Sequence, residues 1–256
     1  MKVLLVPSTV TCPDQDANQF LTSYVIDDAV AIDAGSLGLY GDAEDQARVR
    51  HVFLSHTHAD HIATLPIFVE NAYEGRRDCL TIHGGADVLD CLRRHVFNDR
   101  IWPDFERLSP PDAPFFRMAE LVPFRPVEVD RLRITPIPVD HVVPTYGFVI
   151  EGPGASVVVA SDTGPTEAIW RRANATPDLK AVFLEAAFPD AMAELAAASK
   201  HLCPARFAAE VAKLDRPVPV YAVHLKSRFR DRILRELEAL GLPDLRIAHC
   251  GAAYQF

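Results

Sequence analysis

Four metal-capable side chains fall within six positions of the segment "LSHTHADHIATLP" (residues 54–66): His56, His58, Asp60 and His61. Alternate side chains of an extended segment share a face, so His56 and His58 can reach the same cation. Asp60 and His61 follow where the chain is expected to turn into a helix beginning near Ile62, and they would point toward a second cation. Imidazole nitrogens and carboxylate oxygens suit zinc, and the same ligand set accepts manganese or iron. The alternative, that these residues cap a helix, explains Asp60 but not three clustered histidines.

Three more metal-capable residues stand where apolar runs end: His141 after "ITPIPVD", Asp162 after "SVVVAS" and His224 after "VPVYAV". Sites of open α/β folds collect at the ends of buried strands, so these residues are expected to complete the site. The remaining candidates occupy other kinds of position and are expected to be structural or exposed. These are His51, His83, His95 and His249.

The elements that must position these residues are visible as apolar runs and helical spacings. Short strands are predicted at "KVLLV", "SYVI", "AVAIDAG", "HVFLS" and "CLTIHGG", with a hairpin turn at "DD" (27–28) and helices at 42–50 and 86–97. Strands return at "LRITPIPV", "YGFVIE" and "SVVVASD", followed by strand–helix units with helices at 164–174, 189–214 and 228–241. This pattern favours an α/β fold in which helices cover the outer faces of the sheets.

The middle of the chain, about 98–126, differs from the rest. It holds four prolines in "NDRIWPDFERLSPPDAPFFRM" and bulky residues without a period. We expect an irregular insert that serves as a substrate lid or as an arm in a homodimer interface. No Pro/Gly/Ser-rich linker divides the chain, so residues 1–256 are predicted to form a single domain.

The net charge of −9 argues against a polymeric nucleic-acid partner, although a small anion could bind in a locally positive pocket. No apolar stretch approaches the roughly 18 residues of a membrane span, and "MKVLLVPSTV" is expected to be a strand and not a signal peptide. The five cysteines are scattered and are expected to be reduced thiols that fill the core of a cytoplasmic protein.

The motif "SHTHADH", followed by single His, Asp and His residues at strand ends, resembles the metallo-β-lactamase fold over nearly the whole chain. The resemblance implies a four-layer αββα sandwich with a dinuclear metal site. It implies that His56, His58 and His141 hold one divalent ion. Asp60, His61 and His224 would hold the other, and Asp162 would bridge the two.

Four further segments resemble the class II cyclic nucleotide phosphodiesterases: "LTSYVIDDAVAIDAGSL" (21–37), "FNDRIWPDF" (97–105), "EAAFPDAMAELAAASKHLCP" (185–204) and "AVHLKS" (222–227). The chain has "SKHLCP" where that family has "SGHLTP", and "KS" where it has "KP". By analogy with the related tRNA 3′-processing nucleases, Glu185 and His201 are expected to form a proton-donating pair. Asp60 is counted with this pair among the catalytic residues.

Substrate contacts are expected from three residues. Lys226, two positions after His224, could hold a phosphate oxygen as a point charge, with a solvated surface lysine as the alternative. Trp102 and Phe105 could stack on a purine, or could instead pack the insert against the sheet or a second subunit.

The predicted activity is hydrolysis of 3′,5′-cyclic nucleotides (cyclic AMP or cyclic GMP) to 5′-monophosphates by a metal-bridging hydroxide. A tRNA-processing nuclease would share the site but would need an electropositive surface or arm. A thioester hydrolase would not need the Glu185–His201 pair, since thiolates leave easily. A binding protein without catalysis is the fourth alternative, and retention of all seven ligand types argues against it.

Overall fold

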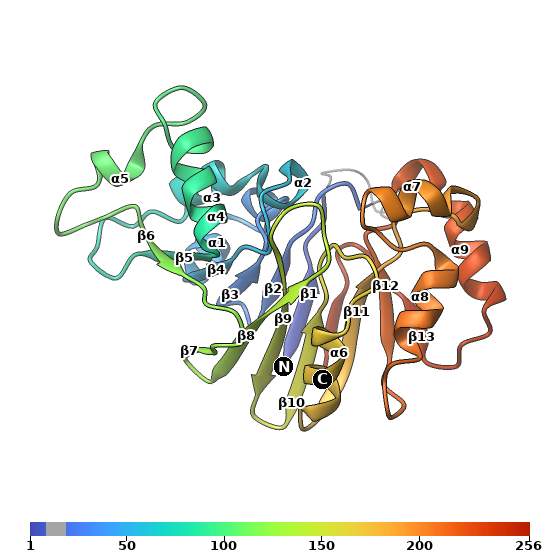
Figure 1. Cartoon of the computed structure of the whole chain (residues 1–256). Coiled ribbons are helices and arrows are strands. Elements are labelled where there is room, and N and C mark those ends of the chain that lie inside the picture. Colours follow the sequence, from blue (N-terminus) through green and yellow to red (C-terminus); the bar gives the residue numbers. More distant parts are fainter. Residues whose placement is uncertain (9–18) are drawn as a thin grey trace.

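The computed structural model describes residues 1–8 and 19–256, and within them two sheets of seven strands face each other (Figure 1). The first sheet has the order β14 (Ala253–Gln255), β1 (Lys2–Leu5), β2 (Tyr24–Ile26), β3 (Val30–Ile32), β4 (His51–Phe53), β5 (Leu80–Gly84), β6 (Phe116–Glu120). The second has the order β13 (Leu245–Ile247), β12 (Val220–Val223), β11 (Leu179–Glu185), β10 (Ala155–Val159), β9 (Thr145–Gly152), β8 (Leu132–Val139), β7 (Val127–Val129).

Helices cover the outer face of each sheet (Figure 1). On the first sheet they are α1 (Ala43–Arg48), α3 (Leu65–Asn71) and α4 (Ala86–Cys91), the last continued by a π-helical turn over Leu92–Val96. On the second they are α6 (Ala168–Ala175), α8 (Pro204–Val211) and α9 (Arg230–Ala239). The layers are therefore helix, sheet, sheet and helix, which confirms the expected αββα sandwich.

Three apolar layers stabilise this sandwich: one between the two sheets and one between each sheet and its helices. Successive residues of a strand point alternately into the inner layer and into an outer layer. In β3, Val30 and Ile32 pack between the sheets, whereas Ala31 packs toward the helices of the first sheet. In β10, Val157 and Val159 face the space between the sheets and Val158 faces the outer helices. Both faces of these strands are covered, which explains why their sequences are continuously apolar.

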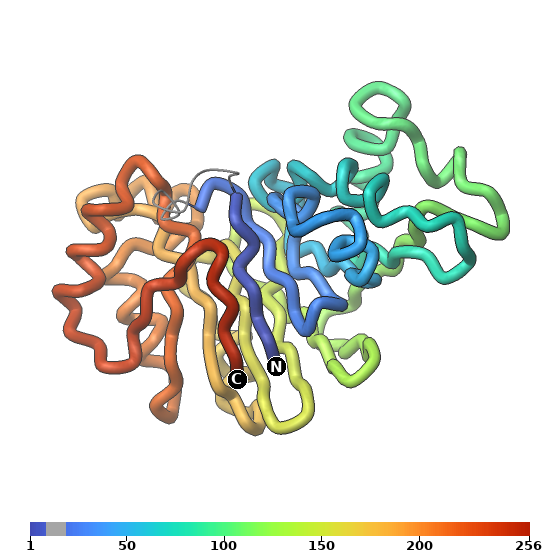
Figure 2. Tube along the Cα trace, turned by 180° about the vertical axis from the view of Figure 1, so that it is seen from behind, coloured from blue at the N-terminus to red at the C-terminus, as the bar shows by residue number. Residues whose placement is uncertain are grey.

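Both chain ends lie in the first sheet, where β1 pairs antiparallel with β14. Figure 2 shows the two ends side by side, and the Met1 ammonium donates a hydrogen bond to the Phe256 carbonyl oxygen at 2.9 Å. The hairpin turn predicted at residues 27–28 is confirmed. Asp27 and Asp28 have φ of 48° and 58°, the left-handed values of a type I′ turn.

Several predicted elements differ in extent. The helix expected near Ile62 begins earlier, as α2 (Ala59–Ile62), and α3 follows it after a break. The helix expected over 189–214 is divided into a 3-10 turn (Asp190–Met192), α7 (Ala193–Ala198) and α8. The segment 98–126 is not wholly irregular: it contains α5 (Phe105–Leu108) and β6, which pairs with β5 and so extends the first sheet.

The cysteine expectation holds only in part. Cys203 is buried, whereas Cys79, Cys91 and Cys250 are half-buried. Cys12 lies outside the described residues. Within residues 1–8 and 19–256, none of the helices combines the length and apolar character that a membrane span needs.

Candidate active site

The candidate site lies at one edge of the sandwich, where strands of both sheets end near α2 (Figure 1). In the first sheet, β4 leads directly into the segment that carries His56, His58, Asp60 and His61. In the second sheet, His141 follows β8, Asp162 follows β10, Glu185 ends β11 and His224 follows β12. Because β10, β11 and β12 are mutually parallel, their carboxyl ends deliver side chains to the same edge.

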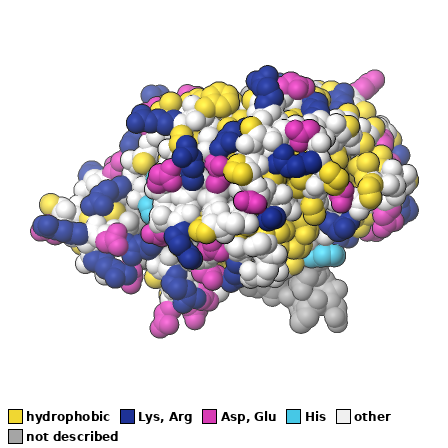
Figure 3. All heavy atoms as spheres, turned by 90° about the horizontal axis from the view of Figure 1, so that it is seen from below, with side chains coloured by type: hydrophobic (Ala, Val, Ile, Leu, Met, Phe, Trp, Pro, Cys, Tyr) yellow, Lys and Arg dark blue, Asp and Glu magenta, His cyan; other side chains and the backbone are white. Residues whose placement is uncertain are grey.

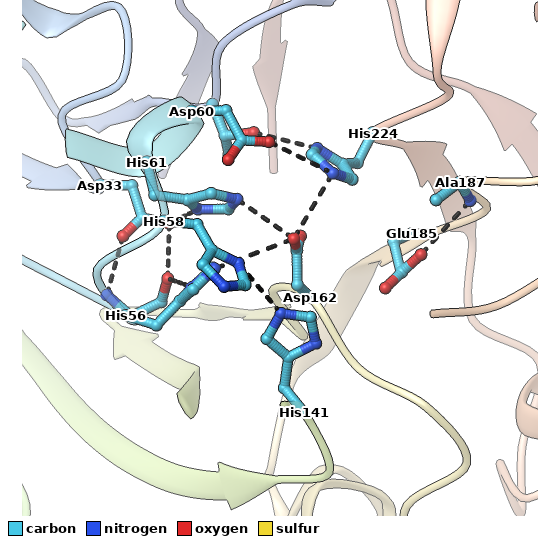
Figure 4. Close-up of polar contacts among 12 residues, drawn as sticks. Asp33, His56, His58, Asp60, His61, His141, Asp162, Glu185, Ala187 and His224 are labelled. Carbon is cyan, nitrogen blue, oxygen red and sulfur yellow. Dashed lines mark hydrogen bonds and ion pairs between the residues drawn. The ribbon is translucent and has the colours of Figure 1, made fainter. Parts of the chain in front are cut away.

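All seven sequence-predicted ligands meet there, around Asp162 (Figure 4). One group consists of His56, His58, His141 and Asp162, and the other of Asp60, His61, Asp162 and His224. In each group, one ligand atom per residue lies within 4.8 Å of every other. Asp162 belongs to both groups, which is the position of a residue that bridges two ions.

The donor set fits divalent cations. His56 Nε2 and His61 Nε2 are buried, yet within the described part of the chain neither has a hydrogen-bond partner. Buried polar atoms nearly always have a hydrogen-bond partner, so these two unpartnered nitrogens indicate that they bind a ligand such as a metal ion. Asp162 Oδ2 lies 3.4 Å from Nε2 of His61 and 3.4 Å from Nε2 of His224. Imidazole and carboxylate groups that converge in this way are the ligands of a divalent-metal centre.

The protonation states of the histidines favour this role, because an imidazole must be neutral to bind a metal. Burial lowers the pKa values of His56, His58 and His141, and burial also lowers that of His224, to about 4. His61 differs: burial lowers its pKa, but the charges of Asp162 and Asp33 outweigh this effect and raise it well above the usual value. Metal binding at His61 would therefore release a proton.

Asp33 is a candidate site residue that was not singled out from the sequence. This buried carboxylate accepts hydrogen bonds from Ser55 N (2.7 Å) and Ser55 Oγ (2.8 Å), and contacts His61 Nδ1 at 2.7 Å. It thereby orients the His61 ring so that Nε2 faces the centre. Its position in "AIDAG", at the end of a predicted strand, is the one sequence feature that could have indicated a role near the histidines.

Similar supports hold other ligands. His141 Nδ1 lies 3.1 Å from the Lys200 carbonyl oxygen, and His224 Nδ1 lies 3.3 Å from Thr22 Oγ1. His224 has a left-handed backbone with φ of 56°, as has Asp33 with φ of 59°. This conformation costs a non-glycine residue roughly 1–2 kcal/mol, so the surrounding structure must impose it at these positions.

Gly35 allows the loop after β3 to pack directly against α2. A Cβ atom at this position would lie 1.9 Å from the Asp60 carbonyl oxygen. Thr22 N donates to that same oxygen at 2.8 Å, and Ala34 N donates to the His61 carbonyl oxygen at 2.7 Å. The backbone of the second ligand group is thus fixed from two sides.

Glu210 supports the loop that follows Asp162. It is buried and accepts hydrogen bonds from Thr166 N (3.1 Å), Trp170 Nε1 (2.6 Å) and Lys213 Nζ (2.7 Å). Glu210 could not be found from the sequence, because Thr166 and Trp170 precede it by 44 and 40 positions and no motif marks the contact.

Glu185 and His201 form the contact that the sequence analysis expected. His201 Nδ1 lies 2.7 Å from Glu185 Oε1. The carboxylate also accepts backbone hydrogen bonds from Thr163 (2.8 Å), Leu202 (3.2 Å) and Ala187 (3.3 Å). The His201 ring lies beside His141 and stacks on His224, with centroids 5.0 and 5.8 Å apart. The pair therefore borders both ligand groups.

The pKa values of both members of this pair are raised, for different reasons. It raises the pKa of Glu185, against the opposing effect of His201. Burial alone would lower the pKa of His201, but the hydrogen bond and charge of Glu185 more than offset it, so the pKa is raised. The arrangement suits an imidazole that holds a proton near neutral pH.

Lys226 reaches the centre from the end of β12. Its ammonium lies 3.2 Å from His224 Nε2 and 3.6 Å from Asp60 Oδ2. A positive charge therefore already lies between two members of the second ligand group.

The two aromatic residues expected to hold a base are placed differently. Phe105 is buried, with its ring stacked on Phe115 at a centroid distance of 4.1 Å, and Trp102 packs against the same apolar cluster on the outer face of the first sheet. The alternative that these rings pack the insert is the one that the structure shows. Phe105 is only 4% exposed. The assignment of the two rings as substrate contacts stays a prediction, and packing is the role in which the structure places them.

Comparison with known proteins agrees with this geometry. The family model described as the beta-lactamase superfamily domain matches residues 37–225, which is most of the chain. The chain belongs to this superfamily. The crystal structure of unliganded yeast PDE1 superposes with a TM-score of 0.75 at 19% identity, over 98% of each chain. At that identity the likeness shows the metallo-β-lactamase fold and no more.

Several relatives carry functional names. A probable 3′,5′-cyclic-nucleotide phosphodiesterase of Yersinia pestis is 26% identical over 74% of this chain and 62% of its own length. A ribonuclease Z of Mycobacterium bovis is 31% identical over 57% of this chain and 51% of its own length. The chain thus spans between half and two thirds of each of these two relatives.

Proposed function

We propose that this chain is a metal-dependent phosphodiesterase that opens 3′,5′-cyclic nucleotides to 5′-monophosphates, with two zinc ions as its cofactors. The observation that carries the proposal is the buried Glu185–His201 pair at the border of the two ligand groups, since phosphodiester hydrolysis needs a proton for its alkoxide leaving group. The name of the Yersinia pestis relative supports the choice of substrate class.

His56, His58 and His141 would hold one ion, Asp60, His61 and His224 the other, and Asp162 both. When bound, such ions polarise phosphoryl oxygens and make hydroxide available near neutral pH. Their charge exceeds that of Asp60 and Asp162, so the centre attracts an anionic phosphodiester although the chain as a whole is acidic.

The residues of the chain supply the proton and the positioning. Because His201 Nδ1 contacts Glu185, Nε2 remains as the nitrogen that donates a proton to the departing 3′ oxygen. Glu185 keeps the ring oriented and stabilises its charged form. General acid catalysis of this kind contributes roughly 10²–10⁴-fold. The Lys226 ammonium would turn from Asp60 toward a phosphate oxygen of the substrate.

The proposal is tested by turnover of cyclic AMP, cyclic GMP, a 2′,3′-cyclic nucleotide and a thioester, each with and without a chelator. We expect the 3′,5′-cyclic nucleotides to give 5′-monophosphates in a chelator-sensitive reaction. Turnover of the thioester alone would overturn the proposal.

A tRNA-processing nuclease is the second candidate, favoured by the M. bovis relative and by the same Glu–His pair. The charges of the chain disfavour it. Residues 92–115, which project from the first sheet around α5, are called the projecting segment (Figure 1). Arginines of this segment are balanced by carboxylates, as in the Arg93–Glu106 and Arg107–Asp99 ion pairs. Figure 3 views the molecule from below Figure 1, on the side away from α2, and positive and negative side chains are interspersed on that face too. A precursor tRNA assay distinguishes the two candidates.

A further inference from the structure

A cavity of about 180 Å³ opens between the ends of β5 and β6 and the connection from β8 to β9. It is smaller than the roughly 300–1,000 Å³ pockets that bind drug-sized ligands, and it suits a single planar ring system. Its lining is apolar on the walls and acidic at the rim. The residues that matter here are Asp87, Val88, Glu120, Leu121, Pro144 and Tyr146.

The cavity lies on the same edge as the metal-ligand groups. In the first sheet β5 is the neighbour of β4, and β6 is the neighbour of β5. Adjacent strands are about 4.8 Å apart, so the cavity lies roughly 5–10 Å along the edge from the strand that leads into His56. Tyr146 N donates to the Ser55 carbonyl oxygen at 3.1 Å, and Pro144 is only three positions after His141. The cavity and the centre are thus built from shared segments.

The walls can hold an aromatic ring. The half-buried Tyr146 ring packs over Gly85, where a Cβ atom would lie 3.1 Å from Tyr146 Cε2. This contact supports one side of the ring, while Val88, Leu121 and Pro144 supply other apolar surface. Aromatic side chains bind nucleobases by stacking, whatever the base. Apolar walls alone would therefore accept either purine.

The rim can distinguish the purines. Asp87 and Glu120 are exposed, and within residues 1–8 and 19–256 neither has a hydrogen-bond or ion-pair partner. Asp87, Glu120 and Tyr146 line the same cavity. Burial raises the pKa of the Tyr146 hydroxyl, and the negative charges of Asp87 and Glu120 raise it further. An ionised carboxylate only accepts hydrogen bonds. Guanine offers two adjacent donors, N1–H and the 2-amino group, whereas the 6-amino group of adenine stands beside the acceptor N1.

We propose that this cavity binds the base of the cyclic nucleotide and that Asp87 and Glu120 select guanine over adenine. The inference rests on the proposed function for its substrate class. One ribose joins the base and the cyclic phosphate of a nucleotide. The short distance between them agrees with a base site that lies next to the metal-ligand groups on the same edge of the sandwich.

The test compares the metal-loaded wild-type protein with the double variant Asp87→Asn/Glu120→Gln, which removes both charges at nearly constant shape. Asp90→Asn is the matched control, since Asp90 is on the same helix but pairs with Arg94. Calorimetry measures binding of GMP and AMP, and initial rates give kcat/KM for cyclic GMP and cyclic AMP. We expect a guanine preference of about tenfold or more in the wild type and the control, and less than twofold in the double variant.

The two readouts separate this inference from the proposed function. If cyclic nucleotides are opened without a base preference, or if the double variant keeps the preference, the inference is overturned and the proposed function stands. If GMP binds better than AMP in a manner that depends on Asp87 and Glu120 but no cyclic nucleotide is opened, the base site stands and the proposed reaction fails. Absence of both binding and turnover overturns both.

Discussion

At the scale of single residues, the candidate centre depends on side chains that never enter a ligand group. Asp33 orients His61, Glu185 orients His201, and the Lys200 carbonyl oxygen contacts His141. A partner on one ring nitrogen fixes the orientation of the ring and leaves the other nitrogen facing the centre, so these contacts influence which atoms are available for binding or for proton transfer.

Replacement of Asp33 tests the orientation of His61. Asp33→Asn removes the charge opposite His61 Nδ1 and places an amide in a site where Ser55 already donates twice. We expect the affinity for Zn²⁺ to fall about 10- to 100-fold in titrations against a chromophoric chelator. Asp112→Asn, an exposed change in the projecting segment, should leave that affinity unaltered. An unchanged affinity in Asp33→Asn would show that His61 needs no orienting partner.

Replacement of His201 tests its assignment as the proton donor. His201→Ala should lower kcat for cyclic AMP by about 10²–10⁴-fold, because the ribose oxygen then leaves without a proton. Turnover of bis(p-nitrophenyl) phosphate should fall far less, since nitrophenolate needs little protonation. Parallel rate measurements on the two substrates check this, and equal losses would remove His201 from the role of acid.

At the scale of secondary structure, the site is an edge where strand ends from two sheets meet and short loops approach one another closely. The loop after β3 touches α2 through Gly35, so the first sheet positions the second ligand group by backbone contact. Such a contact leaves no space for even one added methyl group.

A methyl group at Gly35 tests this packing. Gly35→Ala should displace α2, lower the free energy of unfolding by about 1–3 kcal/mol and weaken metal binding at the same time. Gly75→Ala is the matched control: Gly75 has φ of +65° and open space around it. The control should lose about 1–2 kcal/mol from backbone strain with no change in metal affinity. Thermal unfolding measures the stability of both variants, and metal titration measures their metal affinity. Normal metal affinity in Gly35→Ala would refute the role of this contact.

The sequence was most informative about strands that carry ligands at their ends. Motif spacing and strand-end positions identified all seven residues that the structure brings together, along with the Glu185–His201 contact. It was least informative about the segment 98–126, where the prolines suggested an irregular loop although β6 forms an edge strand there. It was also uninformative about Phe105, whose burial depends on packing against Phe115 ten positions later. Asp33 and Glu210 were missed because hydrogen bonds between distant segments leave no local pattern.

At the scale of the whole molecule, burial of ionisable groups makes stability depend on pH. His83, on β5, is buried with its ring stacked on Phe53 of the neighbouring strand and its Nε2 atom 3.1 Å from His51 Nδ1. Burial lowers its pKa to about 4. The unfolded chain binds a proton at His83 below about pH 6.5, whereas the folded chain does not until about pH 4. The stability linked to this residue is therefore complete above pH 6.5 and is lost as the pH falls toward 4.

This linkage can be measured by replacing the residue. Between pH 7 and pH 5 the wild-type protein should lose about 2 kcal/mol more of its free energy of unfolding than His83→Phe, which keeps the ring stacking but cannot titrate. Urea denaturation of the metal-free proteins at both pH values provides the comparison. The same loss in both proteins would mean that His83 is protonated without cost in the fold.

The central claim is that residues from both sheets together hold two divalent ions. The most direct test is the metal content of the purified protein after equilibration with Zn²⁺ and removal of loosely bound metal, measured by inductively coupled plasma mass spectrometry. We expect two equivalents per chain in the wild type and fewer than one in Asp162→Ala, because Asp162 belongs to both ligand groups. Retention of less than one equivalent by the wild type, or of two by the variant, would contradict the account.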